Sequence, residues 1–347
     1  MNIDVMEEVL AAFALPNARV ESFGSGLINH TWKIYTDASN YILQKINDNV
    51  FKEPRDIAYN IRLVATYLKE NHSDYRFVAP LSTVDGEDLF FAKDQGWFRL
   101  MPFVENSLAF DVVQTADQAY EAAKQFGRFT RMLSGLDVGN LKITIPHFHD
   151  LSLRFQQFLK AVSYGNEKRI DQSKPLINDL IQHKNIVDEY KGIAHNSEFK
   201  WRATHHDTKI SNVLFDKDNK GLCVIDLDTV MPGYFISDVG DMMRTYLSPF
   251  GEEEKDLGKI LVRKNFYQAI VEGYSEEIKN ELTPVEKKYF LFAGKFMIYM
   301  QALRFLTDHL NDDIYYGAKY EGHNLIRASN QAALLQHLIE MDRAASN

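Results

Sequence analysis

The sequence predicts an α+β fold of two lobes, a small β-rich N-terminal lobe with one helix and a larger, mostly helical C-terminal lobe. A chain of 347 residues exceeds the usual range of a single core. Short β-like runs separated by turns dominate up to Phe103, whereas helical patterns dominate after Glu105. We therefore expect a nucleotide-binding lobe over residues 1–103 and a catalytic, acceptor-binding lobe over residues 104–347.

The N-terminal part contains five β-like runs, at residues 21–26, 31–35, 41–46, 88–92 and 97–101. One helix is expected after Pro54, between the third and fourth runs, because apolar residues recur there at helical spacing. An amphipathic helix is also expected within the first 15 residues.

The C-terminal part opens with a capping box at Thr115 and Gln118, which predicts the start of a long helix. A second capping box, Thr283 with Glu286, predicts a helix that reaches about Leu310. Between these helices, two apolar runs flank the polar turn at residues 216–221. Residues 212–228 are therefore predicted to form a β-hairpin.

Composition and charge point to a small-molecule partner. The formal net charge is -9, which argues against a nucleic-acid surface or an anionic-membrane surface. Cys223 is the single cysteine, so no intrachain disulfide is expected and a reducing, cytoplasmic setting fits. The apolar segment 289–306 is interrupted by Lys295, Gln301 and Arg304, a pattern typical of a buried helix and not of a membrane span.

The chemistry is expected around the hairpin. His205, Asp207 and Asn212 form the pattern H-x-D-x-x-x-x-N, and Asp226 and Asp228 follow the second hairpin strand. Phosphoryl transfer needs a carboxylate that accepts the hydroxyl proton. It also needs an amide oxygen and a second carboxylate that hold magnesium against nucleotide phosphates.

This pattern resembles the aminoglycoside phosphotransferase and choline kinase type, a family with a protein-kinase-like fold that uses ATP and Mg²⁺. The resemblance covers nearly the whole chain. Residues 206–214, 224–233 and 303–308 are most similar to the N-acetylhexosamine 1-kinases. That similarity implies transfer of the γ-phosphate of ATP to the anomeric hydroxyl of GlcNAc or GalNAc.

The resemblance also implies residue roles. Asp207 would be the base, Asn212 and Asp226 the magnesium ligands, and Asp238 a brace of the catalytic loop. His205 is expected to support that loop by packing or hydrogen bonding. The role of Asp228 stays open between the second metal and the sugar, since strand alternation would place it on the same side as Asp226.

Nucleotide binding is expected at three places. The turn of Gly24, Ser25 and Gly26 would let backbone amides approach phosphates. Lys45 on the third strand is the candidate phosphate cation, although the family pattern would align Gln44 with that position. The change in composition predicts a hinge that offers backbone groups to adenine, made by Phe103, Val104 and Glu105.

The acceptor pocket is expected around the end of the last apolar helix. Arg304 and Asp308 are one helical turn apart and can pair with each other. The candidate acceptor-binding residues are Asp228, Arg304, Asp308 and Tyr316, with Tyr315 and Arg327 nearby.

Two alternatives remain open. One is a kinase of another small hydroxyl acceptor: choline, homoserine, methylthioribose or an aminoglycoside. The other is a non-catalytic nucleotide-binding pseudokinase. The choice between GlcNAc and GalNAc and the oligomeric state also stay open.

Overall fold

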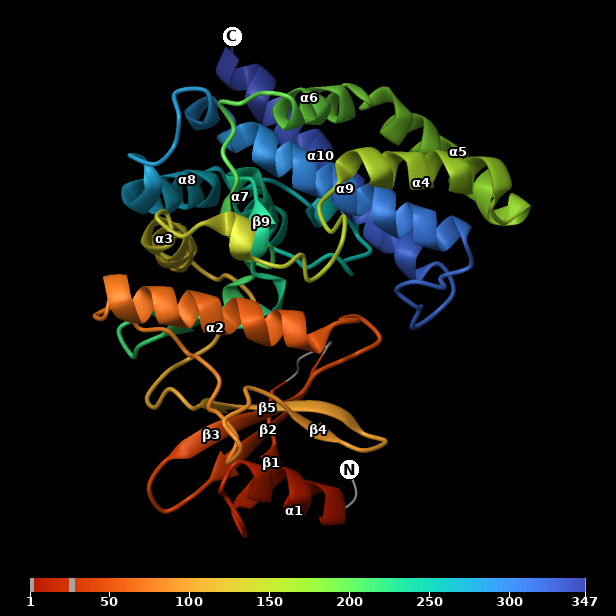
Figure 1. Ribbon diagram of the computed structural model, residues 1–347. Coiled ribbons are helices and arrows are strands. Elements are labelled where there is room, and N and C mark those ends of the chain that lie inside the picture. The colour runs from red at the N-terminus through yellow and green to blue at the C-terminus, as the bar shows by residue number, and fades with distance from the viewer. Residues whose placement is uncertain (1–2, 25–28, 347) are drawn as a thin grey trace. The chain divides into compact units, whose positions relative to one another are not determined.

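The computed structural model describes residues 3–24 and 29–346. Contacts divide the chain into two compact units. The sheet unit comprises Met1–Leu108, Met132–Pro146 and Leu214–Pro232, and the helical unit comprises Ala109–Arg131, His147–Val213 and Gly233–Asn347. The predicted α+β class, with strands concentrated in the first part and helices in the remainder, is confirmed (Figure 1).

An antiparallel sheet with strand order β1-β2-β3-β5-β4 forms the centre of the sheet unit. Its strands lie close to the five predicted runs: β1 Arg19–Ser22, β2 His30–Tyr35, β3 Asn40–Lys45, β4 Phe90–Ala92 and β5 Gly96–Pro102. Helix α1, Ile3–Ala12, packs Val9 and Leu10 into a core with strand residues. The expected helix after Pro54 is α2, Pro54–Asn71, with Pro54 in its first turn.

The register of β3 and β5 assigns side chains to the two faces of the sheet. Leu43 pairs with Leu100, and both are buried in the core that α1 covers. Because neighbouring residues of a strand point to opposite faces, the next pair, Gln44 with Arg99, lies on the other face. Lys45 pairs with Phe98, which is a member of the α1-covered core.

The helical unit is organised around α9, Phe290–Leu310, which packs against α4, α7 and α10 (Figure 1). The other helices are α3 Ala116–Met132, α4 Leu151–Tyr164, α5 Glu167–Gln182, α6 Asn185–Ala194, α7 Phe235–Tyr246, α8 Lys264–Ile278 and α10 His323–Ser346. The Thr115 capping box forms as predicted, since the Gln118 N–H donates to Thr115 Oγ1 at 3.2 Å. Within the part of the chain that the structure describes, no helix combines the length and apolarity needed to cross a membrane.

The start of α9 corrects the sequence prediction. The Glu286 N–H donates to Thr283 Oγ1 at 3.1 Å, so the second capping box does form. It opens only the short 3₁₀ helix Glu286–Lys288, and α9 begins at Phe290. The Glu286 carboxylate is fully buried and accepts two guanidinium N–H groups from Arg202, at 2.6 and 2.8 Å. This long-range ion pair fixes the segment before α9.

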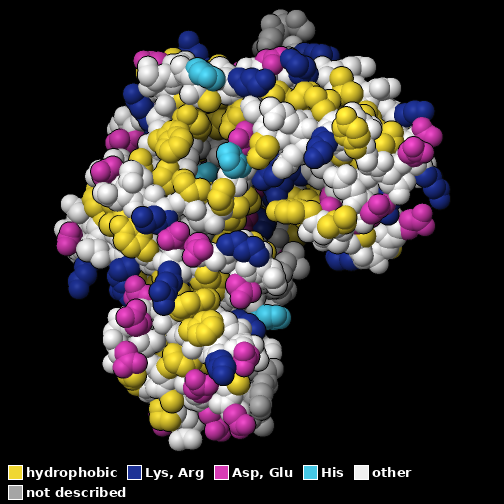
Figure 2. All heavy atoms as spheres, turned by 45° about the vertical axis from the view of Figure 1, so that its right-hand side comes forward, with side chains coloured by type: hydrophobic (Ala, Val, Ile, Leu, Met, Phe, Trp, Pro, Cys, Tyr) yellow, Lys and Arg dark blue, Asp and Glu magenta, His cyan; other side chains and the backbone are white. Residues whose placement is uncertain are grey.

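The predicted hairpin is confirmed as β7 Val213–Phe215 and β8 Gly221–Val224. Two further short strands flank this region, β6 Arg202–Thr204 and β9 Met231–Gly233. The remaining 3₁₀ helices are Val138–Asn140, Ile210–Asn212, Leu227–Thr229 and Leu257–Lys259. Figure 2 shows acidic and basic side chains interspersed among hydrophobic ones on the displayed face.

Candidate active site

Asp207 lies in a tight loop of the helical unit, between β6 and the 3₁₀ helix Ile210–Asn212. His206 has a φ of 66°, in the left-handed region that few non-glycine residues adopt. The N–H groups of His205 and His206 donate to the Asp238 carboxylate at 3.2 and 2.7 Å. The resemblance gives Asp238 a bracing role, and these two hydrogen bonds are the contacts that a brace requires.

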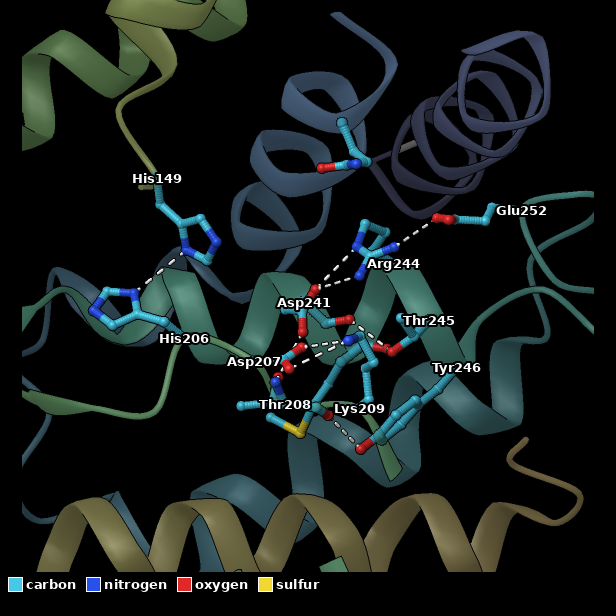
Figure 3. Close-up of polar contacts among 12 residues, drawn as sticks. His149, His206, Asp207, Thr208, Lys209, Asp241, Arg244, Thr245, Tyr246 and Glu252 are labelled. Atoms are coloured by element: carbon cyan, nitrogen blue, oxygen red, sulfur yellow. Dashed lines mark hydrogen bonds and ion pairs between the residues drawn. The ribbon is translucent and has the colours of Figure 1, made fainter. Parts of the chain in front are cut away.

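Helix α7 holds the same loop at further points (Figure 3). The Thr208 N–H donates to Asp241 at 2.8 Å, and the Thr208 hydroxyl donates to the Asp238 carbonyl at 2.7 Å. The Tyr246 hydroxyl donates to the Thr208 carbonyl at 2.6 Å. Since the polar groups of this loop are bound to one helix, the Asp207 backbone is fixed before any ligand arrives.

Complete burial raises the pKa of Asp238 to about 6, while His205 and the two loop N–H groups act in the opposite direction. The two backbone hydrogen bonds and the nearby His205 compensate only part of the cost of burying this carboxylate. The brace therefore contains a buried titratable group.

The Asp207 carboxylate is 17 % exposed and has two polar neighbours. Lys209 Nζ lies 2.9 Å from Oδ1, and Asn212 Nδ2 donates to Oδ2 at 3.1 Å. Burial raises the pKa of Asp207, but Lys209, together with the positive potential of His205 and Arg244, outweighs burial, so the net pKa lies below its ordinary value. The carboxylate is ionised at neutral pH and able to accept a proton.

The arrangement of Asn212 fits an oxygen ligand for a hard cation. Its Nδ2 also donates to the Asp207 carbonyl at 2.8 Å, which fixes the orientation of the amide. The side-chain oxygen accepts no hydrogen bond within residues 3–24 and 29–346. Mg²⁺ prefers carboxylate and amide oxygens, so the donor set is chemically suitable.

Asp226 belongs to the sheet unit and adopts a left-handed conformation, with φ 61° and ψ 62°. The predicted strand alternation between Asp226 and Asp228 is wrong, because β8 ends at Val224 and a 3₁₀ turn covers Leu227–Thr229. The Asp228 side chain is 2 % exposed. One of its oxygens accepts Asn29 Nδ2 at 2.8 Å, and the other accepts a guanidinium N–H of Arg99.

Sequence reasoning missed Arg99. Its Nε and Nη2 groups donate to Gln44 Oε1 at 3.0 and 2.8 Å. The available signal was a lone arginine within the apolar run 97–101. Gln44 faces Arg99, whereas Lys45 lies on the opposite face of β3. The role of Lys45 as the phosphate cation stays a prediction.

The glycine turn is described only at its edges, because Ser25 and Gly26 lie outside the described residues. Gly24 has a φ of 75°, a conformation that favours glycine. After the turn, Asn29 Oδ1 accepts the Asn47 N–H at 3.0 Å.

The expected hinge is anchored to Asn40 on β3. The Phe103 N–H donates to the Asn40 carbonyl at 3.0 Å, and Glu105 accepts the Asn40 side-chain amide at 2.7 Å. The Val104 carbonyl accepts the Ser107 hydroxyl at 2.6 Å. These groups are already engaged within the chain, and the adenine role of Phe103, Val104 and Glu105 stays a prediction.

In the helical unit, Arg304 lies among aromatic rings. The centre of its guanidinium is 5.8, 5.9 and 5.4 Å from the ring centroids of Phe148, Tyr315 and Tyr316. Its hydrogen-bond partners are the side-chain amide oxygen of Gln301, Oε1, at 3.4 Å and the Tyr315 hydroxyl at 3.5 Å.

The suggested pairing of Arg304 with Asp308 is wrong, because both Asp308 oxygens are used elsewhere. They accept the backbone N–H groups of Tyr315 and Tyr316 at 2.7 and 2.9 Å, and the Asn324 side-chain amide at 3.1 Å. Asp308 is 4 % exposed and anchors the loop that carries the two tyrosines.

His149 adds a neutral imidazole beside this cluster. Its Nδ1 lies 3.4 Å from His206 Nδ1 (Figure 3). Its pKa lies well below the ordinary value, because burial, and then the positive potential of His206 and Arg304, disfavour the imidazolium. Phe148 and His149 were not predicted, since only the folded chain brings residues 148–149 next to the catalytic loop.

Arg244 and Arg327 form a charge network behind the loop. Arg244 pairs with Asp241 at 2.8 Å and with Glu252 at 3.0 Å. Arg327 also pairs with Glu252. The carboxylates of this network are therefore neutralised within the chain.

Comparison with known proteins identifies the chain's relatives. The phosphotransferase enzyme family matches residues 19–277. A microcompartment-associated aminopropanol kinase superposes with a TM-score of 0.65 at 16 % identity, over 98 % of each chain. Amicoumacin kinase in complex with AMP-PNP, Ca²⁺ and Ami gives a TM-score of 0.63 at 15 % identity, over 96 % of this chain and 92 % of that chain.

A choline/ethanolamine kinase family protein from Mesorhizobium loti gives a TM-score of 0.60 at 14 % identity, over 97 % of this chain and 95 % of that chain. At these identities the structures show the fold alone. That fold is the protein-kinase-like one predicted from the sequence.

Proposed function

Because the chain belongs to the phosphotransferase enzyme family, we propose that it is an ATP- and Mg²⁺-dependent small-molecule kinase whose acceptor is the anomeric hydroxyl of an N-acetylhexosamine. The family match supports the phosphotransferase part of this proposal. The sugar rests on the sequence motifs and on the surroundings of Arg304.

Asp207 is the proposed base. Its carboxylate accepts the proton of the acceptor hydroxyl while that oxygen bonds to the γ-phosphorus of ATP, and the bond to the ADP oxygen breaks. Lys209, 2.9 Å from Asp207, keeps the carboxylate ionised and adds positive charge where phosphoryl oxygens are expected.

Asn212 and Asp226 are the proposed Mg²⁺ ligands. The buried Asn212 amide oxygen is free of other hydrogen bonds among the described residues. A bound Mg²⁺ would neutralise charge on the nucleotide phosphates and orient them. AMP-PNP and Ca²⁺ in the amicoumacin kinase structure support nucleotide and divalent-cation use by this fold.

The observation that carries the choice of acceptor is the position of Arg304 over three aromatic rings. Among the described residues, no carboxylate pairs with its guanidinium. Its planar donors suit a sugar hydroxyl or an N-acetyl carbonyl, and aromatic rings offer surface to the apolar face of a pyranose. A second cation, Arg154, donates from Nη2 to the backbone carbonyl of Phe148 at 3.4 Å, and the Phe148 ring is one of the three near Arg304. A positive environment of this kind disfavours a cationic acceptor.

A cationic acceptor is the second candidate. The similar structures include an aminopropanol kinase and a choline/ethanolamine kinase family protein. ADP release with Mg²⁺-ATP should therefore be measured in parallel with GlcNAc, GalNAc, choline, ethanolamine and an aminoglycoside. We expect turnover with an N-acetylhexosamine. Turnover with only a cationic acceptor would reject the sugar assignment, and nucleotide binding without turnover would favour a pseudokinase.

Arg304→Ala tests the pocket. We expect kcat/KM for the N-acetylhexosamine to fall by about 10–100-fold, the size of one or two lost charged hydrogen bonds, with the KM for ATP unchanged. Arg343→Ala is the matched control, because Arg343 is exposed on α10. Equal loss for ATP and sugar, together with a lower Tm, would show that Arg304 is structural.

A further inference from the structure

A buried polar cluster in the sheet unit, made of Asn29, Gln44, Arg99 and Asp228, has no role in the function proposed above. Arg99 is 1 % exposed and Asp228 is 2 % exposed, so their ion pair is shielded from water. Gln44 accepts two N–H groups of Arg99, and Asn29 donates to the Asp228 oxygen that Arg99 does not use. We call these four residues the Arg99 cluster.

Burial of this ion pair argues against a purely stabilising role. Desolvation of two charges offsets much of their attraction, and apolar replacements of buried pairs are often as stable. Both ends of the cluster connect to segments with a proposed function. Asn29 follows the glycine turn, and its side-chain Oδ1 accepts the Asn47 N–H at 3.0 Å. Asp228 lies two residues after Asp226.

Asp226 needs support from its surroundings, because its φ of 61° is unfavourable for a residue with a side chain. The short turn Leu227–Thr229 connects it directly to Asp228. Two strong contacts, to Arg99 and Asn29, therefore hold the turn at its centre.

We propose that Arg99 is a positioning residue that neutralises Asp228 and thereby holds Asp226 and Asn29 in the geometry that binds a nucleoside triphosphate with its divalent cation. This proposal rests on the proposed use of ATP and Mg²⁺. In this proposal Asp228 is the ion-pair partner of Arg99 and is not a ligand of a second metal or of the sugar.

The cluster also contains Gln44, the residue that the family pattern aligns with the phosphate lysine. Kinases of this general fold use a lysine on the third strand paired with a glutamate on the following helix. Here Gln44 lies across from Arg99 in the register of β3 and β5, and the cation comes from the neighbouring strand. Its anionic partner, Asp228, comes from the segment after β8.

The test measures AMP-PNP binding by calorimetry, with MgCl₂ and separately with EDTA, so no acceptor is needed. The variants are Arg99→Met, Asp228→Asn, the double variant, and the uncharged Asn29→Ala. A positioning role predicts that all four weaken AMP-PNP binding in Mg²⁺ by about 10–100-fold, as loss of outer-shell partners commonly does. Binding in EDTA should change much less.

The double variant separates positioning from stability. Removing one partner leaves an unpaired buried charge and should lower Tm strongly, whereas removing both should recover most of the loss. A positioning role predicts that the double variant regains Tm but keeps the weakened Mg²⁺-dependent binding. Arg62→Met is the matched control, since Arg62 forms an ion pair with Asp88 in the same unit, with Nε 3.0 Å from Oδ1.

The outcome distinguishes failure of the positioning role from failure of the proposed function. A folded double variant, or a folded Asn29→Ala variant, that binds Mg²⁺-AMP-PNP like the wild type would overturn the positioning role. Wild-type protein that binds no AMP-PNP in Mg²⁺ would instead reject the proposed function on which this inference rests.

Discussion

Asp228 and Asp238 are both buried aspartates, but their charges are compensated in different ways. Asp228 faces the guanidinium of Arg99, whereas Asp238 accepts two backbone N–H groups of the catalytic loop. The first arrangement links segments of the sheet unit, and the second fixes the loop that carries Asp207. Substitution of Asp228 should therefore affect mainly nucleotide binding, whereas substitution of Asp238 should affect mainly the pH dependence of stability.

Asp238→Asn should change how stability depends on pH. Burial raises the pKa of Asp238 from 3.8 to about 6, so between these values the native state binds more protons than the unfolded state. The free energy of unfolding therefore contains a term that is most favourable below pH 4 and is lost as the pH rises through 6. A shift of about two pKa units corresponds to roughly 3 kcal/mol.

The measurement is Tm of wild type and Asp238→Asn at several pH values from 4 to 7. Asparagine does not titrate, so the stability of the variant relative to wild type should improve as the pH rises. The substitution also weakens the hydrogen bonds to the loop, which lowers the Tm of the variant by an amount that does not depend on pH. A difference in Tm that stays constant across this range would contradict the raised pKa.

Sequence patterns predicted those site residues that lie close to each other in the sequence. Asp207 and Asn212 are five positions apart in one loop, and the structure brings their side chains within hydrogen-bonding distance. Arg99 and Asp228 are 129 positions apart, and their contact depends on the register of β3 with β5. A one-residue shift of that register would turn Arg99 to the other face, so a single sequence could not reveal the pair.

Helices α7 and α9 approach each other closely at Gly240. A Cβ atom built there would lie 2.4 Å from the Ala293 carbonyl oxygen and 2.8 Å from Met297 Cβ. Because α7 also holds the catalytic loop through Asp238 and Asp241, this packing affects the site.

Gly240→Ala should therefore destabilise the protein by about 1–3 kcal/mol, the usual cost of overpacking. Gly192→Ala in α6 is the matched control, since its added Cβ would meet nothing within 4 Å. The control should gain about 0.5–1 kcal/mol from improved helix propensity. Chemical denaturation of both variants measures these changes, and equal stability of the two would contradict the close packing of α7 on α9.

Element prediction succeeded where periodicity and caps act locally, as in α2 and α3. It failed at the start of α9, where the capping box opens only the 3₁₀ helix Glu286–Lys288 and Glu286 also binds Arg202 from a distant strand. It also failed after β8, where the 3₁₀ turn Leu227–Thr229 replaces the expected strand alternation. In both places, a residue of the segment makes a long-range contact that a local sequence pattern does not encode.

At the scale of the whole molecule, each of the two compact units carries residues with a proposed role. Asp207 and Asn212 belong to the helical unit, whereas Asp226 and the positioning residue Arg99 belong to the sheet unit. The sheet unit takes in residues 132–146 and 214–232 as well as the first 108. A boundary near residue 103 follows the change in composition, but the later segments join this unit through long-range contacts that composition does not encode.

The central claim is that Asp207 is the base of a small-molecule kinase, and single-turnover phosphoryl transfer by Asp207→Asn tests it most directly. The acceptor should be the one that gives the highest ADP release with wild type, and Asp218→Asn, in the exposed hairpin turn, is the control. We expect the transfer rate to fall by roughly 10²–10⁴-fold, with Mg²⁺-AMP-PNP affinity close to that of wild type. A variant that transfers phosphate at the wild-type rate would contradict the account.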